Sequence, residues 1–231
     1  MKRMFLRQIA VVAIPLLFWS CQIRGAQALS APALSARCAV LMDGESGRIL
    51  YEKNGDVPRP MASITKIMTA LVAIEHSENL KAEVEILSDY LQEEGSSIYL
   101  KVGERVKLET LLYGLMLESG NDAAAAIAGF CAGDLQTFVG WMNQRAEQMG
   151  LCNTKFQNPS GLSADEHYAS AADMAKITRE AMKNETFAKI FGTKEIVLEN
   201  RSFRNHNKLL WQYEGAIGGK PALPKQPAEP L

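Results

Sequence analysis

The sequence predicts a mixed fold of the α/β (α+β) class, because a β-hairpin signal is followed by a mostly helical chain. Residues 36–42 and 48–53 are predicted as strands, and the turn-forming run Asp43-Gly44-Glu45-Ser46-Gly47 lies between them. Apolar residues then recur at helical spacing from Ile67 to Ile74, which predicts a largely buried helix that begins at Ser63. Further helices are predicted at 108–117, 122–131, 135–149, 171–182 and 186–191, and short strands at 84–87 and 194–198.

Residues 1–28 predict a secretory signal peptide. Basic residues near the N-terminus precede an apolar run at 9–19, and Ala26-Gln27-Ala28 follow as a small-residue cleavage site. A membrane anchor is the alternative, but the apolar run is too short to span a bilayer and contains Pro15. We therefore expect a secreted, extracytoplasmic protein whose ordered domain covers residues 29–220.

The charge balance gives no support to nucleic-acid binding. The whole chain carries 25 Lys and Arg residues against 26 Asp and Glu residues. Loss of the predicted signal peptide removes four basic residues and no acidic ones, which makes the formal charge −5. A basic surface that could follow a phosphate backbone is not expected from this balance.

Ser63 and Lys66 form a Ser-x-x-Lys pair at the start of the predicted helix. Residues three apart on a helix share one face, so the hydroxyl and the amine are one turn apart. The serine can act as a nucleophile if a neutral lysine accepts its proton, which requires desolvation or a second cation near the lysine. The helix N-terminus adds N–H groups where an oxyanion would develop. Taken alone, the pair is more typical of an N-cap serine and a solvated lysine, because Ser-x-x-Lys arises by chance in many helices.

Ser119-Gly120-Asn121 lies at the junction of two predicted helices. Its side chains are therefore expected on a connecting turn, where a second hydroxyl and a carboxamide could relay a proton and hold a substrate amide. The alternative is helix capping, because serine and asparagine are both favoured before a helix. For the neighbouring Asp122, a capping role is favoured over support of the site.

Four runs along the chain resemble, in order, the motifs of serine-type D-alanyl-D-alanine carboxypeptidases, the low-molecular-weight penicillin-binding proteins. They are Pro60-Met61-Ala62-Ser63-Ile64-Thr65-Lys66, Ser119-Gly120-Asn121-Asp122-Ala123, Asn158-Pro159-Ser160-Gly161-Leu162 and Gly215-x-x-Gly218-x-Lys220. The glycine at 120 favours this group over class A β-lactamases. The resemblance implies a β-lactamase-like, penicillin-binding fold, with an antiparallel sheet flanked by a helical cluster and the site in the groove between them.

The resemblance also implies an acyl transfer and a role for each residue. Ser63 would attack the carbonyl between the two terminal D-alanines of a peptidoglycan stem peptide, and Lys66 would accept its proton. Ser119 would complete the proton path, while Asn121 and Lys220 would bind the substrate. β-Lactam antibiotics such as penicillin would acylate Ser63 by the same attack. The resemblance implies no metal and no cofactor, and it implies a part in cell-wall biogenesis and cell shape at the cell-wall face of the bacterial membrane.

The sequence departs from the family pattern after Lys220. The family continues this lysine into Lys-Thr-Gly on a central strand, whereas Pro221-Ala222 follow here, and proline cannot continue a central ladder. Loss of an oxyanion-hole donor on that strand typically lowers turnover by roughly 10²–10³. We therefore expect an incomplete peptidase domain without its C-terminal strands and inactive as given, in contrast to membrane-associated full-length relatives. The tail at 221–231 is expected to be disordered and to come from a one-base frameshift, which the nucleotides at codon 220 test.

Two other functions stay open at this stage. A non-catalytic secreted protein could keep the helical scaffold and bind peptidoglycan or penicillin without hydrolysis. A β-lactamase would turn penicillin over rapidly, but the Ser-Gly-Asn motif argues against it. The histidines at 76, 167 and 206 lack ligand spacing, which predicts surface or loop positions instead of a metal site.

Overall fold

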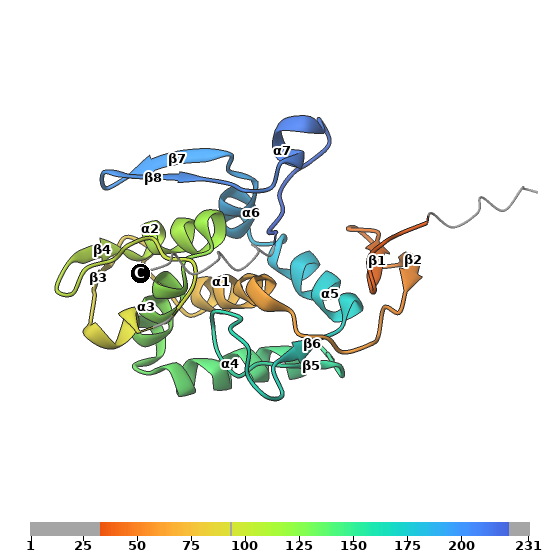
Figure 1. Cartoon of the computed structure of the whole chain (residues 1–231), viewed down its shortest axis with the longest axis horizontal. Coiled ribbons are helices and arrows are strands. Elements are labelled where there is room, and N and C mark those ends of the chain that lie inside the picture. Colours follow the sequence, from red (N-terminus) through yellow and green to blue (C-terminus); the bar gives the residue numbers. More distant parts are fainter. Residues whose placement is uncertain (1–32, 93, 222–231) are drawn as a thin grey trace, which may run out of the picture. The chain divides into compact units, whose positions relative to one another are not determined.

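The computed structural model describes residues 33–92 and 94–221, and from Ala36 onward the chain forms one compact unit (Figure 1). The predicted signal peptide lies outside the described residues, and so does the predicted tail apart from Pro221. The division of the chain into these segments therefore stays a prediction. The predicted mixed α/β class is confirmed, because helices and antiparallel strand pairs both occur along the described residues.

The predicted N-terminal hairpin is present as β1 (Ala39–Met42) and β2 (Ile49–Lys53). The turn closes through a backbone bond from Asp43 N to Arg48 O at 2.9 Å, and the Asp43 carboxylate accepts the N–H of Ser46 at 2.7 Å. The hairpin packs on α5 (Ala171–Ala181), where the Arg179 guanidinium donates to two turn carbonyls. Turns of this kind favour short polar residues and glycine, and this composition allowed the turn to be predicted from the sequence.

The buried centre of the unit is α1 (Lys66–Glu75), the predicted apolar helix. It contacts α3 (Asn121–Ala132), α4 (Leu135–Gln148), α5 and α6 (Glu185–Gly192), which surround it in Figure 1. The alanines at 123–126 and 128 in α3 are buried, and their small side chains let neighbouring helices approach closely. Side-chain caps from Asp134, Ser170 and Asn184 begin α4, α5 and α6.

Two of the predicted helices begin or end differently from the expected α-helix. The helix expected from Ser63 starts as a 3₁₀ turn, η1 (Ala62–Thr65), and becomes α-helical only at Lys66. The helix expected at 108–117 is α-helical as α2 (Leu108–Tyr113) and continues as the π-helical turn η3 (Gly114–Glu118). Short π-helical turns often occur at functional sites, and both irregular turns here adjoin the predicted motifs.

The remaining strands form short antiparallel pairs. Within the described residues each strand pairs with one partner, so the hairpin β1–β2 has no third strand there. The pairs are β3 (Glu83–Glu85) with β4 (Arg105–Lys107), β5 (Thr154–Lys155) with β6 (Tyr168–Ala169), and β7 (Glu195–Leu198) with β8 (Arg201–Arg204). Two short helices complete the described elements, η2 (Ser88–Leu91) and α7 (Leu209–Gln212). The sequence missed both of these helices and the strands β4, β5, β6 and β8.

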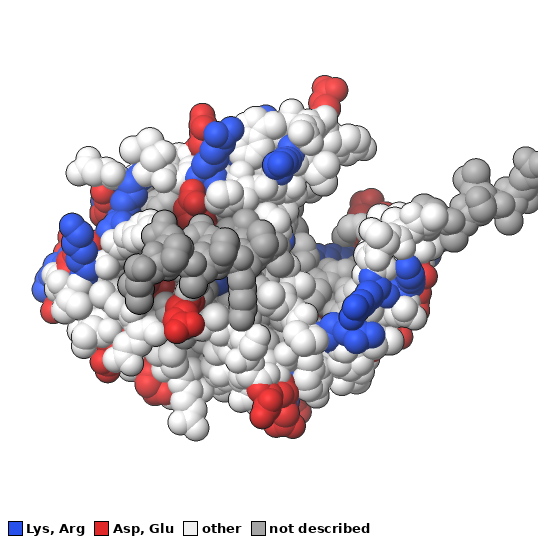
Figure 2. All heavy atoms as spheres, in the orientation of Figure 1, with Lys and Arg blue, Asp and Glu red and all other residues white. Residues whose placement is uncertain are grey.

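The described surface and helices carry two further observations. Lys and Arg side chains are interspersed with Asp and Glu side chains on the face drawn in Figure 2. Among the described helices none is by itself long and apolar enough to cross a membrane, and the pair α3 and α4 meets that criterion only together, across a bend of 87°.

Candidate active site

Ser63 lies in the 3₁₀ turn η1, against the loop at 158–161. The turn is strained, because Ala62 has a φ of +47°. Gly161, with a φ of +87°, approaches it so closely that an added Cβ would lie 2.0 Å from Ala62 O. Only glycine fits this contact without displacing the Ala62–Ser63 backbone. The Ser63 side chain is thus presented, half-buried, by a turn that is pressed between α1 and the loop.

Lys66 is fully buried and connects three parts of the site. Its Nζ lies 3.4 Å from Ser63 Oγ, 2.7 Å from Asn121 Oδ1 and 2.5 Å from Ser160 O. The nucleophile candidate, the Ser119-Gly120-Asn121 turn and the 158–161 loop therefore meet at one ammonium group. The alternative of a solvated lysine does not describe this side chain.

Ser119 ends the π-helical turn in a left-handed conformation, with a φ of +64°. Its hydroxyl is buried and has no hydrogen-bond partner among the residues that the structure describes. A buried hydroxyl without a partner typically costs about 1–3 kcal/mol, so such groups occur where a function requires them. The strained backbone and the free hydroxyl both favour a functional role over helix capping.

Asn121 is the first residue of α3, and its carboxamide is engaged at both ends. Its Oδ1 accepts from Lys66 Nζ, and its Nδ2 donates to Glu94 O at 2.5 Å. Its backbone N–H donates to Ser96 O at 2.7 Å. The geometry places Asn121 as a link between Lys66 and the 94–96 loop, and its role as a substrate-binding residue stays a prediction.

Asp122 combines the favoured capping contact with a supporting one: its Oδ1 accepts the first-turn N–H of Ala123 at 2.9 Å, and the same carboxylate reaches the 97–100 segment. Its carboxylate accepts the N–H groups of Ile98, at 3.0 Å, and Leu100, at 3.2 Å, and the hydroxyl of Ser97, at 2.6 Å. The N-cap residue of α3 is Gly120, which forms no side-chain cap bond. Asp122 therefore also holds the 97–100 segment beside the Ser119 turn, which is the supporting role that the sequence left as the alternative.

Lys220 reaches the same region from the far end of the described chain. Its Nζ donates to Met116 O, in the turn that leads to Ser119, at 3.2 Å. Burial holds the pKa of Lys220 well below its usual range, and the nearby charge of Lys66 lowers it further, whereas Glu118 opposes the shift. A second amine near Lys66 is the arrangement that the neutral-lysine hypothesis requires.

The histidines are placed differently from one another. The expectation of surface or loop positions describes His76 and His206, which are exposed, but His167 is buried within its loop. Sequence reasoning missed this residue, because its contacts to Thr65 and Gln157 are not marked by any local spacing. Across residues 33–92 and 94–221, no group of three or more His, Cys, Asp and Glu side chains could hold a metal ion.

A family model described as D-alanyl-D-alanine carboxypeptidase, Peptidase S11, matches residues 25–221. The chain belongs to this family. It is 38% identical over 200 residues to D-alanyl-D-alanine carboxypeptidase DacF of Bacillus subtilis (strain 168). This alignment covers 81% of this chain and 51% of the relative. It is 38% identical over 216 residues to a D-alanyl-D-alanine carboxypeptidase of Streptomyces sp. (strain K15), with 84% and 74% covered. The chain thus spans about half the length of the Bacillus relative.

Solved structures of the D-alanyl-D-alanine carboxypeptidase family share the fold. The D-alanyl-D-alanine carboxypeptidase from Mycobacterium tuberculosis H37Rv matches with a TM-score of 0.80 and 33% identity, over 84% of this chain and 75% of that one. The Streptomyces K15 DD-transpeptidase matches with a TM-score of 0.77 and 37% identity, over 83% and 81%. The expectation of a penicillin-binding-protein-like fold is therefore confirmed.

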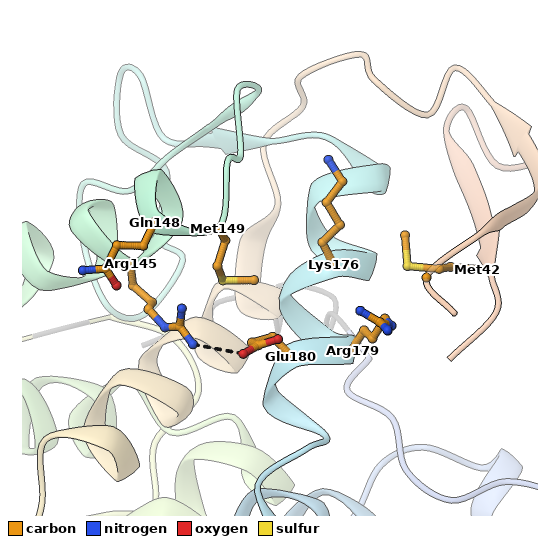
Figure 3. Close-up of a pocket in the computed structure, with 8 residues that line it drawn as sticks. Met42, Arg145, Gln148, Met149, Lys176, Arg179 and Glu180 are labelled. Atoms are coloured by element: carbon orange, nitrogen blue, oxygen red, sulfur yellow. Dashed lines mark hydrogen bonds and ion pairs between the residues drawn. The ribbon is translucent and has the colours of Figure 1, made fainter. Parts of the chain in front are cut away.

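A separate pocket lies between α4, α5 and the turn of the N-terminal hairpin (Figure 3). None of the predicted site residues lines this pocket, neither Ser63 and Lys66 nor Ser119, Asn121 and Lys220. Its charged groups are already paired: Arg145 contacts Glu75 and Glu180, and Arg179 donates to Gly44 O and Glu45 O. These contacts hold helices and hairpin together, so the pocket is not the candidate active site.

Proposed function

We propose that the chain carries the acyl-transfer site of a serine-type D-alanyl-D-alanine carboxypeptidase. The observation that supports this most directly is the position of Lys66 Nζ, within 3.4 Å of Ser63 Oγ and 2.7 Å of Asn121 Oδ1. A buried amine beside a half-buried serine hydroxyl is the arrangement of an activated nucleophile. The family match and the curated relatives support the same reaction class.

The proposed reaction proceeds in two steps. Ser63 Oγ bonds to the carbonyl carbon between the two terminal D-alanines of a stem peptide, and its proton passes to Lys66. The C–N bond then breaks, the leaving D-alanine amine takes up that proton, and an ester on Ser63 remains. Water hydrolyses the ester and returns a proton to Ser63. Ser119, whose hydroxyl has no partner within residues 33–92 and 94–221, is proposed to relay protons between Lys66 and the leaving group, and Lys220 to bind the substrate carboxylate.

Two matters of context belong to the same proposal. The signal-peptide pattern supports action on the cell-wall face of the bacterial membrane, with the stem peptide of peptidoglycan as substrate and β-lactams as inhibitors. The Pro221-Ala222 sequence after Lys220 leads us to expect slow or absent turnover, so acylation and turnover must be measured separately.

The test uses a fluorescent penicillin and a pentapeptide that ends in D-alanyl-D-alanine. The proposal predicts covalent label on Ser63 in the whole chain, loss of the label in Ser63→Ala and a decrease of 100-fold or more in Lys66→Ala, since a positioned base typically contributes about 10²–10⁴. Rapid clearance of the label would indicate a β-lactamase. Reversible binding without covalent label would indicate a non-catalytic binding protein. An added amino-acid acceptor that increases product would indicate transpeptidation, the activity in the name of the Streptomyces K15 structure.

A further inference from the structure

His167 is a buried imidazole with both ring nitrogens engaged. The Gln157 N–H donates to Nδ1 at 3.0 Å, and Nε2 lies 2.9 Å from Thr65 Oγ1. Because Nδ1 accepts a backbone N–H, the proton of the neutral ring resides on Nε2 and is donated to the threonine. Burial lowers the pKa of His167, which favours this uncharged form. The ring edge also packs against Phe156, with ring centroids 6.1 Å apart.

One bond of this ring leads directly to the proposed nucleophile and base. Thr65 is the last residue of η1 and lies between Ser63 and Lys66, fully buried. Its hydroxyl is tied to a residue 102 positions away in the sequence. The bond to His167 therefore fixes the short turn that carries Ser63 and the start of the helix that carries Lys66.

The other bond leads to the loop on the opposite side of Lys66. Gln157 is followed by two carbonyls that hold α1: Pro159 O accepts from Thr69 Oγ1 at 2.7 Å, and Ser160 O accepts from Lys66 Nζ at 2.5 Å. The imidazole thus joins the two segments between which the Lys66 ammonium is held. Displacement of either segment would alter the position of Nζ relative to Ser63 Oγ.

The backbone around His167 is anchored to the chain that precedes the nucleophile. Arg59 and Ala169 form a two-bond antiparallel bridge, with N···O distances of 3.0 and 3.1 Å. His167 is consequently held in register with the segment that leads into η1. A rigid support of this kind is what a site needs for a reproducible distance between two reacting groups.

We propose that His167 is a positioning residue for Ser63 and Lys66, and that it works only as the neutral Nε2–H form, so that acid disconnects it. This inference rests on the proposed acyl-transfer function. Protonation puts an N–H at Nδ1 opposite the Gln157 N–H, and two donors cannot bond to each other. The charged groups around the ring do not offset this loss: Glu166 is paired with Lys155 at 2.7 Å, Asp165 is exposed, and Lys66 on α1 offers no negative charge.

Two variants separate the two bonds of the ring. His167→Asn keeps an acceptor near Nδ1 and loses the donor to Thr65, whereas His167→Gln keeps a donor near Nε2 and loses the acceptor for Gln157. Each should lower the rate of Ser63 acylation by fluorescent penicillin about 10- to 100-fold at neutral pH. Each should also remove the part of the acid decline of that rate that comes from His167, which we expect in the wild-type chain at a pH below the ordinary histidine pKa of about 6.5, because burial lowers the pKa of this ring. The part of the decline that comes from protonation of Lys66 should remain in both variants. His76→Gln, at the far end of α1, is the matched control and should change neither quantity. Wild-type rates and an unchanged pH profile in both His167 variants would overturn the inference.

A second measurement does not depend on acylation. In Ser63→Ala, ¹⁵N NMR of the imidazole should show a neutral Nε2–H ring at pH 7, and acid protonation should shift the Gln157 amide signal in step. A charged ring or an Nδ1–H ring at pH 7 would overturn the inference even if penicillin labels the wild-type chain. If penicillin does not label the wild-type chain, the proposed function is wrong. If His167 titrates in acid and the Gln157 amide signal does not respond, the positioning inference is wrong, whatever the outcome of the labelling.

Discussion

Lys66 Nζ lies 2.7 Å from Asn121 Oδ1, although 55 residues separate the two in the sequence. This contact connects α1, which carries the proposed base, to the turn that carries Ser119 and to the 94–96 loop beyond it. Because the acceptor is a neutral amide oxygen, it orients the ammonium without adding an opposite charge that would stabilise the protonated form. The identity of residue 121 should therefore influence when Lys66 can act as a base.

Asn121→Asp tests this relationship. A carboxylate at the same distance would favour the charged amine, so acylation of Ser63 at pH 7 should fall at least tenfold. The rate should recover as the pH rises, and its half-maximal pH should lie above that of the wild type. The measurement is the rate of fluorescent-penicillin labelling between pH 6 and 10.

Asn79→Asp is the control for the added charge, since Asn79 is exposed and its Oδ1 only accepts the N–H of Lys81. Labelling by this variant should equal that of the wild type. An Asn121→Asp variant with an unshifted pH profile would show that the amide oxygen has no part in setting the charge of Lys66.

The Asp122 carboxylate should contribute far more to stability than a helix cap does. Asp122→Ala leaves the buried N–H groups of Ile98 and Leu100 without their acceptor, so we expect a loss of about 3 kcal/mol in the free energy of unfolding. Asp134→Ala removes an ordinary cap on Thr137 and should lose about 1 kcal/mol. Urea unfolding at pH 7 measures both changes. Equal losses would mean that Asp122 contributes only as a cap, through the N–H of Ala123.

The helices and the main site residues could be predicted because their signals are local. Apolar periodicity predicted α1. The small and polar residues Ser119-Gly120-Asn121, between two apolar segments, predicted a turn between two helices. What periodicity could not indicate was the π-helical geometry of 114–118, which gives Ser119 its left-handed backbone. That geometry depends on packing and not on residue type.

The contacts that complete the site are long-range, and no spacing in the sequence indicates them. Ser160 O binds Lys66 across 94 positions, and His167 binds Thr65 across 102. The loop motif containing Ser160 was recognisable only through family resemblance. His167 has no such marker, since a histidine in a polar loop is normally solvated, and only its burial distinguishes it.

Lys220 should destabilise the folded chain at neutral pH. Its pKa is lowered by burial and by Lys66, so the unfolded chain binds a proton on this amine more readily than the folded chain does. The penalty is present at pH 7 and disappears as the pH rises toward the unfolded pKa of about 10.4. Lys220→Met should therefore raise Tm at pH 7, and the gain should shrink as the pH approaches 10.

Thermal unfolding of both chains at several pH values checks this prediction. Lys183→Met serves as the control, because Lys183 is 59% exposed and pairs with Glu180 at the surface. Its effect on Tm should not follow the trend of Lys220→Met. A gain in Tm for Lys220→Met that stays constant with pH would indicate improved packing and not relief of a buried charge.

Gly161 should be required for the position of Ser63 and not only for backbone conformation. Gly161 and Gly133 have nearly the same φ, +87° and +85°, but an added Cβ meets Ala62 O at 2.0 Å only at Gly161, and nothing within 4 Å at Gly133. Gly133→Ala should lose about 1 kcal/mol of unfolding free energy from backbone strain alone. Gly161→Ala should lose roughly 2–4 kcal/mol, because the 3₁₀ turn must also move.

The two alanine variants should differ most in the chemistry of Ser63. In Gly161→Ala the displaced turn moves Ser63 Oγ from Lys66 Nζ, so penicillin labelling should fall about 100-fold even at a temperature where the variant is fully folded. Gly133→Ala, at the end of α3, should label at the wild-type rate. Because both substitutions impose the same strain, any difference in labelling between them comes from the contact between Gly161 and Ala62. Equal labelling would mean that the contact between Gly161 and Ala62 does not determine the position of Ser63 Oγ relative to Lys66 Nζ.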